Sequence, residues 1–508
     1  MQDTATSNKR IAKNTILLYI RTFFVMLISL YTSRAILDAL GETDFGIYNL
    51  VGGIVVLFSF MNSAMTTATQ RFLNYELGKG NTRQVKRVFS MSLTAHICIA
   101  FLILILGETL GLWFVLTQLN IPLERYEASI WVYHLSLIGC CVNILRIPYS
   151  ACIIAYERMS FFAYVSILES VLKLMIVFML AIAPIDALVF YAVLMLVVIC
   201  VVNSLYILYC NHKFDTARYH FFWDKLLFKQ LMFFSGWSMF GSLASTGVAQ
   251  GMNILLNIFY GVVLNAALGI SHQVHSAVSS FVSSFQTAFS PQIVKTYAAG
   301  QKNDLEKLIC RTSRFSYCLV FIFAPAIIVC ITPILETWLT IVPEYTREFT
   351  IVTILLCMID ALSGPLWVSV QATGEIRNYQ LLLSFISLLN LPFMYVMLLL
   401  GISPIWVVGI RVIIAVIIHF VRVGYLGHKM NFPVIYYMRD VMIRVTIMTC
   451  ISIPLCIILS HYTNRLFLSA IVFALIVLQN SILSFVVGMS RNERSHLILI
   501  VKEKIKRI

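Results

Sequence analysis

Long apolar runs recur from one end of this chain to the other, separated by short polar segments. The first, Asn14–Leu40, would cross a hydrocarbon core of about 30 Å as a helix. Of the 508 residues, 60% are hydrophobic and only 12% are charged, whereas a soluble domain averages about 25% charged. The pattern therefore predicts an all-α polytopic membrane protein with about 14 transmembrane helices. The predicted spans are 14–38, 45–68, 88–117, 129–151, 161–183, 187–209, 231–257, 264–290, 313–337, 349–371, 378–400, 404–425, 441–460 and 467–489.

The basic residues predict which side of the membrane each loop faces. If the N-terminus is interior, the interior segments hold most of the Lys and Arg residues, and the exterior loops hold only Arg125, Arg347 and Arg465. Cytoplasmic loops of membrane proteins carry such an excess of positive charge. We therefore expect both termini in the cytoplasm. The net charge of +14 then follows from topology and does not indicate nucleic-acid binding.

The two halves of the sequence resemble each other at a constant offset of 220 residues. Ser63 corresponds to Ser283, Thr67 to Thr287, Ala68 to Ala288 and Gly80 to Gly300. Because this offset covers six predicted spans, an even number, the halves would be two parallel six-helix bundles related by a pseudo-two-fold axis along the membrane normal. The predicted parts are an N-terminal bundle (1–210), a cytoplasmic loop (211–230), a second bundle (231–430), two additional helices (431–490) and a basic cytoplasmic tail (491–508).

Three stretches resemble the polysaccharide or O-antigen flippases of the multidrug/oligosaccharidyl-lipid/polysaccharide exporter superfamily. They are the opening helix with its arginines, the segment LGETDFGIYNLVGGIV and the segment TTATQRFLNYELGKGN. The resemblance implies a multi-pass protein of the bacterial inner membrane. It would flip an undecaprenyl-pyrophosphate-linked oligosaccharide from the inner to the outer leaflet by alternating access. Its partners would be this lipid-linked glycan, the phospholipid bilayer, and glycan polymerase or assembly proteins.

Charged residues within the predicted spans are the candidate site. A charge at mid-depth costs about 2.5–3.5 kcal/mol on insertion scales, so such residues face protein or a wet cavity, or reach an interface. The candidate substrate-binding cations are Arg21, Arg34, Arg146, Lys173 and Arg411. The candidate coupling or ion-pair acids are Asp38, Glu169 and Asp360.

Each of these charges has a structural reading beside the functional one. Arg34 with Asp38 and Glu169 with Lys173 are four residues apart and suit ion pairs, while Arg21 and Arg146 lie near enough to the interior to extend toward it. Because cations outnumber deep acids, we expect a cationic central cavity, which suits a pyrophosphate better than a cationic drug.

Other classes of function are weaker or stay open. The exterior loops are short, and the sequence shows no spacing typical of a nucleophile, paired carboxylates or metal ligands. We therefore expect neither an enzyme nor a cofactor. Coupling of transport to an H⁺ or Na⁺ gradient stays open. A multidrug or small-metabolite exporter of the same superfamily is the alternative, and the charge sign of the cavity distinguishes the two. The resemblance to flippases of lipid-linked glycans implies that the last two helices form a groove for a lipid tail. Alternatively, they support the second bundle.

Overall fold

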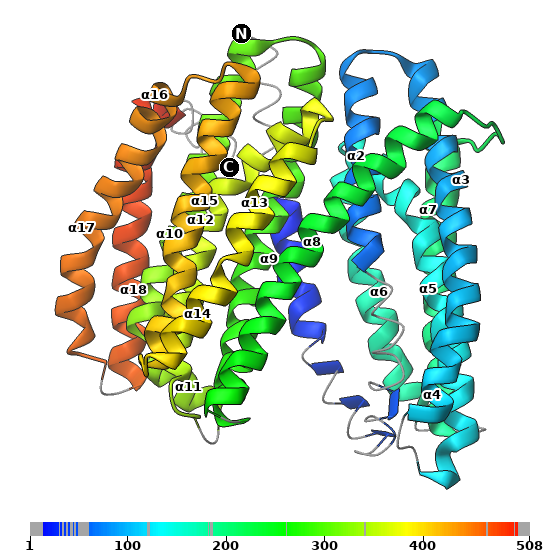
Figure 1. Ribbon diagram of the computed structural model, residues 1–508, viewed down its shortest axis with the longest axis horizontal. Coiled ribbons are helices and arrows are strands. Elements are labelled where there is room, and N and C mark those ends of the chain that lie inside the picture. The colour runs from blue at the N-terminus through cyan, green and yellow to red at the C-terminus, as the bar shows by residue number, and fades with distance from the viewer. Residues whose placement is uncertain are drawn as a thin grey trace, which may run out of the picture. The chain divides into compact units, whose positions relative to one another are not determined.

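The computed structural model is helical throughout the part of the chain that it describes (Figure 1). It describes residues 14–29, 31–32, 35–36, 39–40, 44, 47–48, 60–118, 122–180, 182, 186–260, 262–339, 342–463, 466–491 and 493–495. After the helix Asn14–Ser29, the main helices are α2 (Phe60–Gly78), α3 (Thr82–Leu106), α4 (Leu112–Gln118), α5 (Tyr126–Ala155), α6 (Met159–Leu180), α7 (Ala187–Lys213), α8 (Lys225–Tyr260), α9 (Val262–Ala298), α10 (Lys302–Val329), α11 (Ile331–Trp338), α12 (Thr346–Thr373), α13 (Arg377–Leu388), α14 (Asn390–Leu399), α15 (Pro404–Met430), α16 (Val434–Tyr437), α17 (Ile443–Ser460) and α18 (Leu466–Leu483).

The predicted fold class is confirmed. Ten helical segments within the described residues are long and apolar enough to cross a membrane. Four further predicted spans overlap the helix Asn14–Ser29, α2, α8 and α9. The chain is therefore a multi-pass helical membrane protein, while the predicted side of each loop stays a prediction.

Several helices extend beyond the apolar runs that predicted them. The helix expected to start at residue 88 starts at Thr82, and the one expected at 313 starts at Lys302. At α3 the Asn81 side chain accepts a hydrogen bond from the backbone N–H of Gln84 at 3.1 Å, which is an N-cap. Hydropathy detects only the part of a helix inside hydrocarbon, so it does not reveal polar first turns.

Two spans predicted as single helices are each broken in two, whereas α3 and α4 form one continuous segment through the π-helical turn Gly107–Gly111. The 313–337 segment breaks at Cys330 and the 378–400 segment breaks at Leu389. In a helix, each backbone carbonyl accepts a hydrogen bond from the N–H four residues later. Directly before each break this residue is a proline, which has no N–H, so the carbonyl lacks its donor. Pro333 cannot donate to Val329, where α10 ends, and Pro392 cannot donate to Leu388, where α13 ends.

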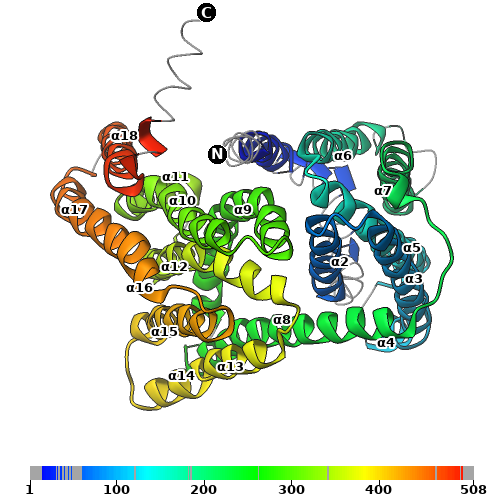
Figure 2. The same ribbon diagram turned by 90° about the horizontal axis from the view of Figure 1, so that it is seen from above.

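The chain forms two compact units. Unit 1 comprises the described residues of 1–242, 287–300 and 374–377, and unit 2 those of 243–286, 301–373 and 378–508. In unit 1, α5 packs against both α3 and α7 (Figure 2). The buried side chains of Val132, Tyr133 and Leu137 belong to the core there. In unit 2, α12 packs against both α10 and α15. Of the candidate charges, Arg146 lies on α5, Asp360 on α12 and Arg411 on α15.

Helix boundaries repeat at the offset found in the sequence. Helices α2 and α9 end 220 residues apart, and so do the starts of α3 and α10 and the starts of α5 and α12. Gly80, in the turn after α2, and Gly300, in the turn after α9, each have a backbone φ of 72°. This left-handed conformation at a helix end favours glycine because a Cβ atom would be strained there.

Asp44, in the stretch LGETDFGIY, is held by a residue of another segment of unit 1. Asp44 is buried and accepts a hydrogen bond from Arg125 Nε at 2.8 Å. Arg125 also pairs with Asp186, which caps the N-terminus of α7. Burial raises the pKa of Asp186, but hydrogen bonds from the Val189 N–H and from Arg125 lower it by more, so this pKa lies below its ordinary value.

The last two helices are joined to unit 2 by a buried charge network. Arg314 on α10 has a side chain only 4% exposed, and its Nη1 donates to Asp440 Oδ1 at 3.0 Å. Its Nη2 donates to Glu493 beyond α18 at 2.8 Å. Arg444 on α17 adds a second cation 3.3 Å from Asp440. The pair α17–α18 is therefore an integral part of unit 2.

Removing Arg314 should destabilise the protein strongly. In Arg314→Met, Glu493 loses the only cation within 4.0 Å among the described residues, and a buried charge left unpaired costs about 3–5 kcal/mol. We expect a lower thermal midpoint in detergent micelles. Arg218→Ala is the control, because its pair with Asp215 is exposed and contributes at most about 1 kcal/mol. Equal midpoints for the two variants would contradict this account.

Candidate functional site

Three predicted residues meet in the interior of unit 1. Glu169 and Lys173 lie one turn apart on α6, and Lys173 Nζ donates to Glu169 Oε1 at 2.7 Å. From α5, Arg146 Nη1 donates to Glu169 Oε2 at 3.2 Å. Arg146 therefore pairs with an acid on the neighbouring helix. From the sequence alone, it could instead have extended toward the cytoplasmic face of the membrane.

Arg21 lies beside this group without a carboxylate of its own. Its guanidinium lies over the ring of Phe162, 4.9 Å from the centroid, and it interacts electrostatically with Glu169 and Tyr206. No carboxylate among the described residues lies within 4.0 Å of it, and its buried Nε has no hydrogen-bond partner there. Arg21 thus adds a positive charge that has no ion pair among the described residues.

Tyr206 on α7 completes the group and was missed by the sequence analysis. Arg146 lies over its ring at 5.6 Å from the centroid, and Tyr206 interacts electrostatically with Arg21 and Glu169 as well. It lies in an apolar run, where no spacing distinguishes it from other packed aromatic residues. Only the packing of α7 against α5 and α6 brings Tyr206 to the cations.

We call Arg21, Arg146, Lys173, Glu169 and Tyr206 the cation cluster. Three cations stand against one carboxylate, so the cluster is net positive. Arginine presents its donors in a planar fork that matches phosphate oxygens, and lysine adds a compact charge. The arrangement can hold an anion with several oxygen atoms.

The charges predicted for the second half form a looser group in unit 2. Arg411 on α15 interacts electrostatically with Asp360 on α12, and its Nη1 lies 3.7 Å from the Met252 sulfur. Asp360 is exposed and has no ion pair within 4.0 Å among the described residues. His275 lies nearby, with its Nδ1 3.0 Å from the Cys357 Sγ.

Two predicted site residues cannot be placed. Arg34 and Asp38 lie outside the described residues, so their proposed pairing stays a prediction. No group of three or more His, Cys, Asp or Glu side chains in the described part of the chain is arranged to hold a metal ion.

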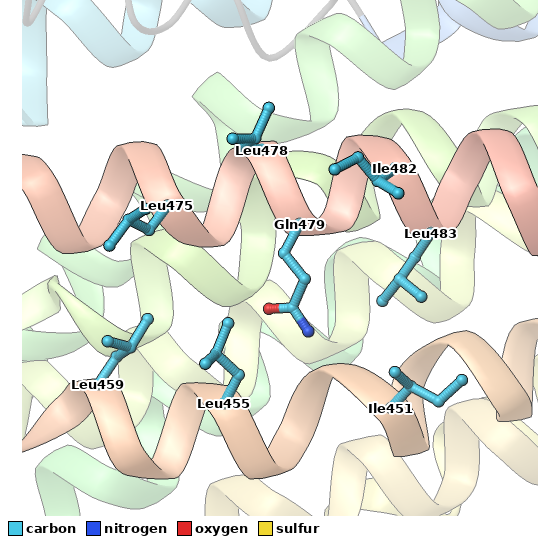
Figure 3. Close-up of a pocket in the computed structure, with 8 residues that line it drawn as sticks. All are labelled: Ile451, Leu455, Leu459, Leu475, Leu478, Gln479, Ile482 and Leu483. Carbon is cyan, nitrogen blue, oxygen red and sulfur yellow. The ribbon is translucent and has the colours of Figure 1, made fainter.

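An apolar groove of about 420 Å³ runs between α17 and α18 (Figure 3). Ile451, Leu455 and Leu459 line it from α17, and Leu475, Leu478, Gln479, Ile482 and Leu483 line it from α18. The Gln479 amide is its one polar side chain and points into the space between the two helices. The groove can accommodate hydrocarbon.

Solved transporter structures share this fold. A multidrug resistance MATE family transporter of the MOP superfamily in an outward-facing conformation matches with a TM-score of 0.72 and 14% identity, covering 84% of this chain and 96% of that one. A MATE structure in the bent conformation matches with a TM-score of 0.71 and 14% identity, over 85% and 96% of the two chains. A MOP superfamily transporter from Pyrococcus furiosus, described with a binding pocket of reverse polarity that suggests a different function, matches with a TM-score of 0.70 and 14% identity, over 85% and 96%.

The chain therefore has the fold of these transporters. No protein-family model and no curated protein sequence matches it.

The cation cluster predicts unequal effects of removing its members. Glu169→Met leaves Arg146 and Lys173 without a carboxylate, whereas Lys173→Met leaves Glu169 paired with Arg146. We expect Glu169→Met to lower the free energy of unfolding by about 1–3 kcal/mol more than Lys173→Met does. Thermal unfolding in detergent micelles compares them. A loss in Lys173→Met as large as that in Glu169→Met would contradict the assigned contacts.

Proposed function

We propose that this protein flips an undecaprenyl-pyrophosphate-linked oligosaccharide, such as an O-antigen or capsule-type repeat unit, from the inner to the outer leaflet by alternating access. The observation that carries the proposal is the net positive cation cluster of unit 1. Arg146 and Lys173 bond one carboxylate, and Arg21 beside them has none within 4.0 Å among the described residues.

The sign of the charge favours an anionic substrate. A site for cationic drugs needs acidic side chains, whereas here one carboxylate faces three cations. A cation within a membrane helix costs free energy, so such residues usually contact an anion or a substrate. A pyrophosphate supplies several oxygen acceptors, which the two arginines and Lys173 can share.

The groove between α17 and α18 supports a substrate that also carries a lipid tail. Several of its leucines and isoleucines are exposed, among them Leu475, Leu478 and Ile482. We propose that part of the polyprenyl chain lies in this groove during transport. The chain then stays in an apolar environment.

The alternative is a multidrug or small-metabolite exporter. One observation favours it: Asp360 is an exposed acid within α12 and has no ion pair within 4.0 Å among the described residues. Such an acid suits a cationic substrate or a coupling cation. For the similar transporter from Pyrococcus furiosus, the reverse polarity of the binding pocket is described as suggesting a different function.

The location of lipid-linked oligosaccharide in cells that lack this protein tests the proposal. We expect finished units to accumulate on the inner face of the cytoplasmic membrane and to reach the outer face when the gene is restored. Normal appearance on the outer face without the protein would overturn the proposal and favour the exporter.

Removing single cations should abolish transport without preventing insertion. Arg21→Ala and Lys173→Ala each remove a charge that would hold the pyrophosphate, so we expect the restored gene to lose at least about tenfold in outer-face oligosaccharide. Arg218→Ala, which changes an exposed loop cation of the same unit, should retain activity. Full activity of both cluster variants at normal expression would refute this site.

Filling the groove should also impair transport. Leu455→Trp places a large ring between α17 and α18, so a hydrocarbon chain would no longer fit. Ile453→Trp is the matched control, because Ile453 is on the same helix, is 48% exposed and is not part of the groove lining. We expect transport to fall in the first variant only. Equal transport by both would contradict a role for the groove.

A further inference from the structure

Both oxygen atoms of Glu169 are engaged by cations. Oε1 accepts from Lys173 at 2.7 Å, and Oε2 accepts from Arg146 at 3.2 Å. The carboxylate therefore bridges a residue on its own helix α6 and a residue on α5. Among the residues that the structure describes, Arg21 and Tyr206 are the other charged or titratable groups that interact with it from the neighbouring helices.

A bridging carboxylate makes the contacts that two oxygens of a phosphate would make. Charge-assisted hydrogen bonds from lysine and arginine to either group have the same donors and similar lengths. A pyrophosphate has more oxygen atoms and more charge, so it can engage Arg21 in addition. A carboxylate and a pyrophosphate cannot occupy the same donors at once.

We propose that Glu169 is a resident counter-anion of the cation cluster, which the pyrophosphate of the substrate displaces on binding. This inference rests on the proposed function and adds a specificity-determining role for Glu169. In the empty protein, Glu169 partly neutralises three cations that would otherwise be costly within the membrane. On binding, Arg146 and Lys173 exchange the carboxylate for phosphate oxygens, and the Glu169 side chain moves away from them.

The exchange sets a threshold for ligands. A ligand must replace two charge-assisted hydrogen bonds, which are stronger than hydrogen bonds between neutral groups. An anion that offers only one weak acceptor does not recover that energy, whereas a pyrophosphate does. Glu169 thus weakens the binding of every anion and leaves only strongly charged, multidentate headgroups bound.

Glu169→Gln tests the proposal, because glutamine keeps the size and hydrogen-bonding ability of the side chain and removes its charge. The probe is inorganic pyrophosphate, titrated by calorimetry into the purified full-length protein in detergent. We expect the dissociation constant of Glu169→Gln to be roughly tenfold lower than that of the wild type, which corresponds to about 1.4 kcal/mol.

Thermal unfolding with and without pyrophosphate separates this role from a merely structural one. We expect the ligand-free variant to melt at a lower temperature than the wild type, since it loses an ion pair with each of two cations. Pyrophosphate should nevertheless raise its midpoint by more than it raises that of the wild type. A purely structural role would lower both the stability and the affinity.

Glu108→Gln is the matched control. Glu108 is another acid on a membrane helix of unit 1, but its partner is His134 at 2.9 Å. The Glu108→Gln variant should bind pyrophosphate with the affinity of the wild type, whereas Arg146→Gln should bind it more weakly.

The outcomes distinguish the two proposals. If the wild type binds pyrophosphate and Glu169→Gln binds it equally or more weakly, the counter-anion role is overturned and the proposed function stands. If neither the wild type nor Glu169→Gln binds pyrophosphate, both proposals are overturned.

Discussion

The cost of an uncompensated charge in hydrocarbon constrains every part of this molecule. Water is absent there, so each cation must find an anion, an aromatic ring or a ligand. Arg146 and Lys173 share Glu169, Arg21 lies over Phe162, and Arg314 is enclosed by Asp440 and Glu493. The positions of these charges follow from that requirement, and helix packing provides the partners.

Much of the fold could be predicted because a bilayer imposes one length on every span. An apolar run of sufficient length predicts a helix almost regardless of its detailed sequence. Helix ends were harder, because the first turns of α3 and α10 are polar and lie outside the apolar runs. The breaks at Cys330 and Leu389 were readable in principle, since Pro333 and Pro392 each remove a backbone donor.

The candidate site was only partly accessible from the sequence. The pairing of Glu169 with Lys173 is visible there, because residues four apart share a helix face. The contact of Arg146 with Glu169 depends on how α5 packs against α6, and that of Arg146 with Tyr206 on how α5 packs against α7. No local pattern encodes either pairing, since the helices meet through apolar side chains that many sequences would supply. The roles of these residues in transport stay proposals.

Arg314 also makes the second bundle dependent on the two helices that follow it. It belongs to α10, inside the repeated part of the chain, yet the two carboxylates that it pairs with in the described part of the chain come from beyond the repeat. A shortened chain ending near residue 430 would leave this buried arginine without either acid. Such a chain would accordingly need an apolar residue at position 314 to insert and fold.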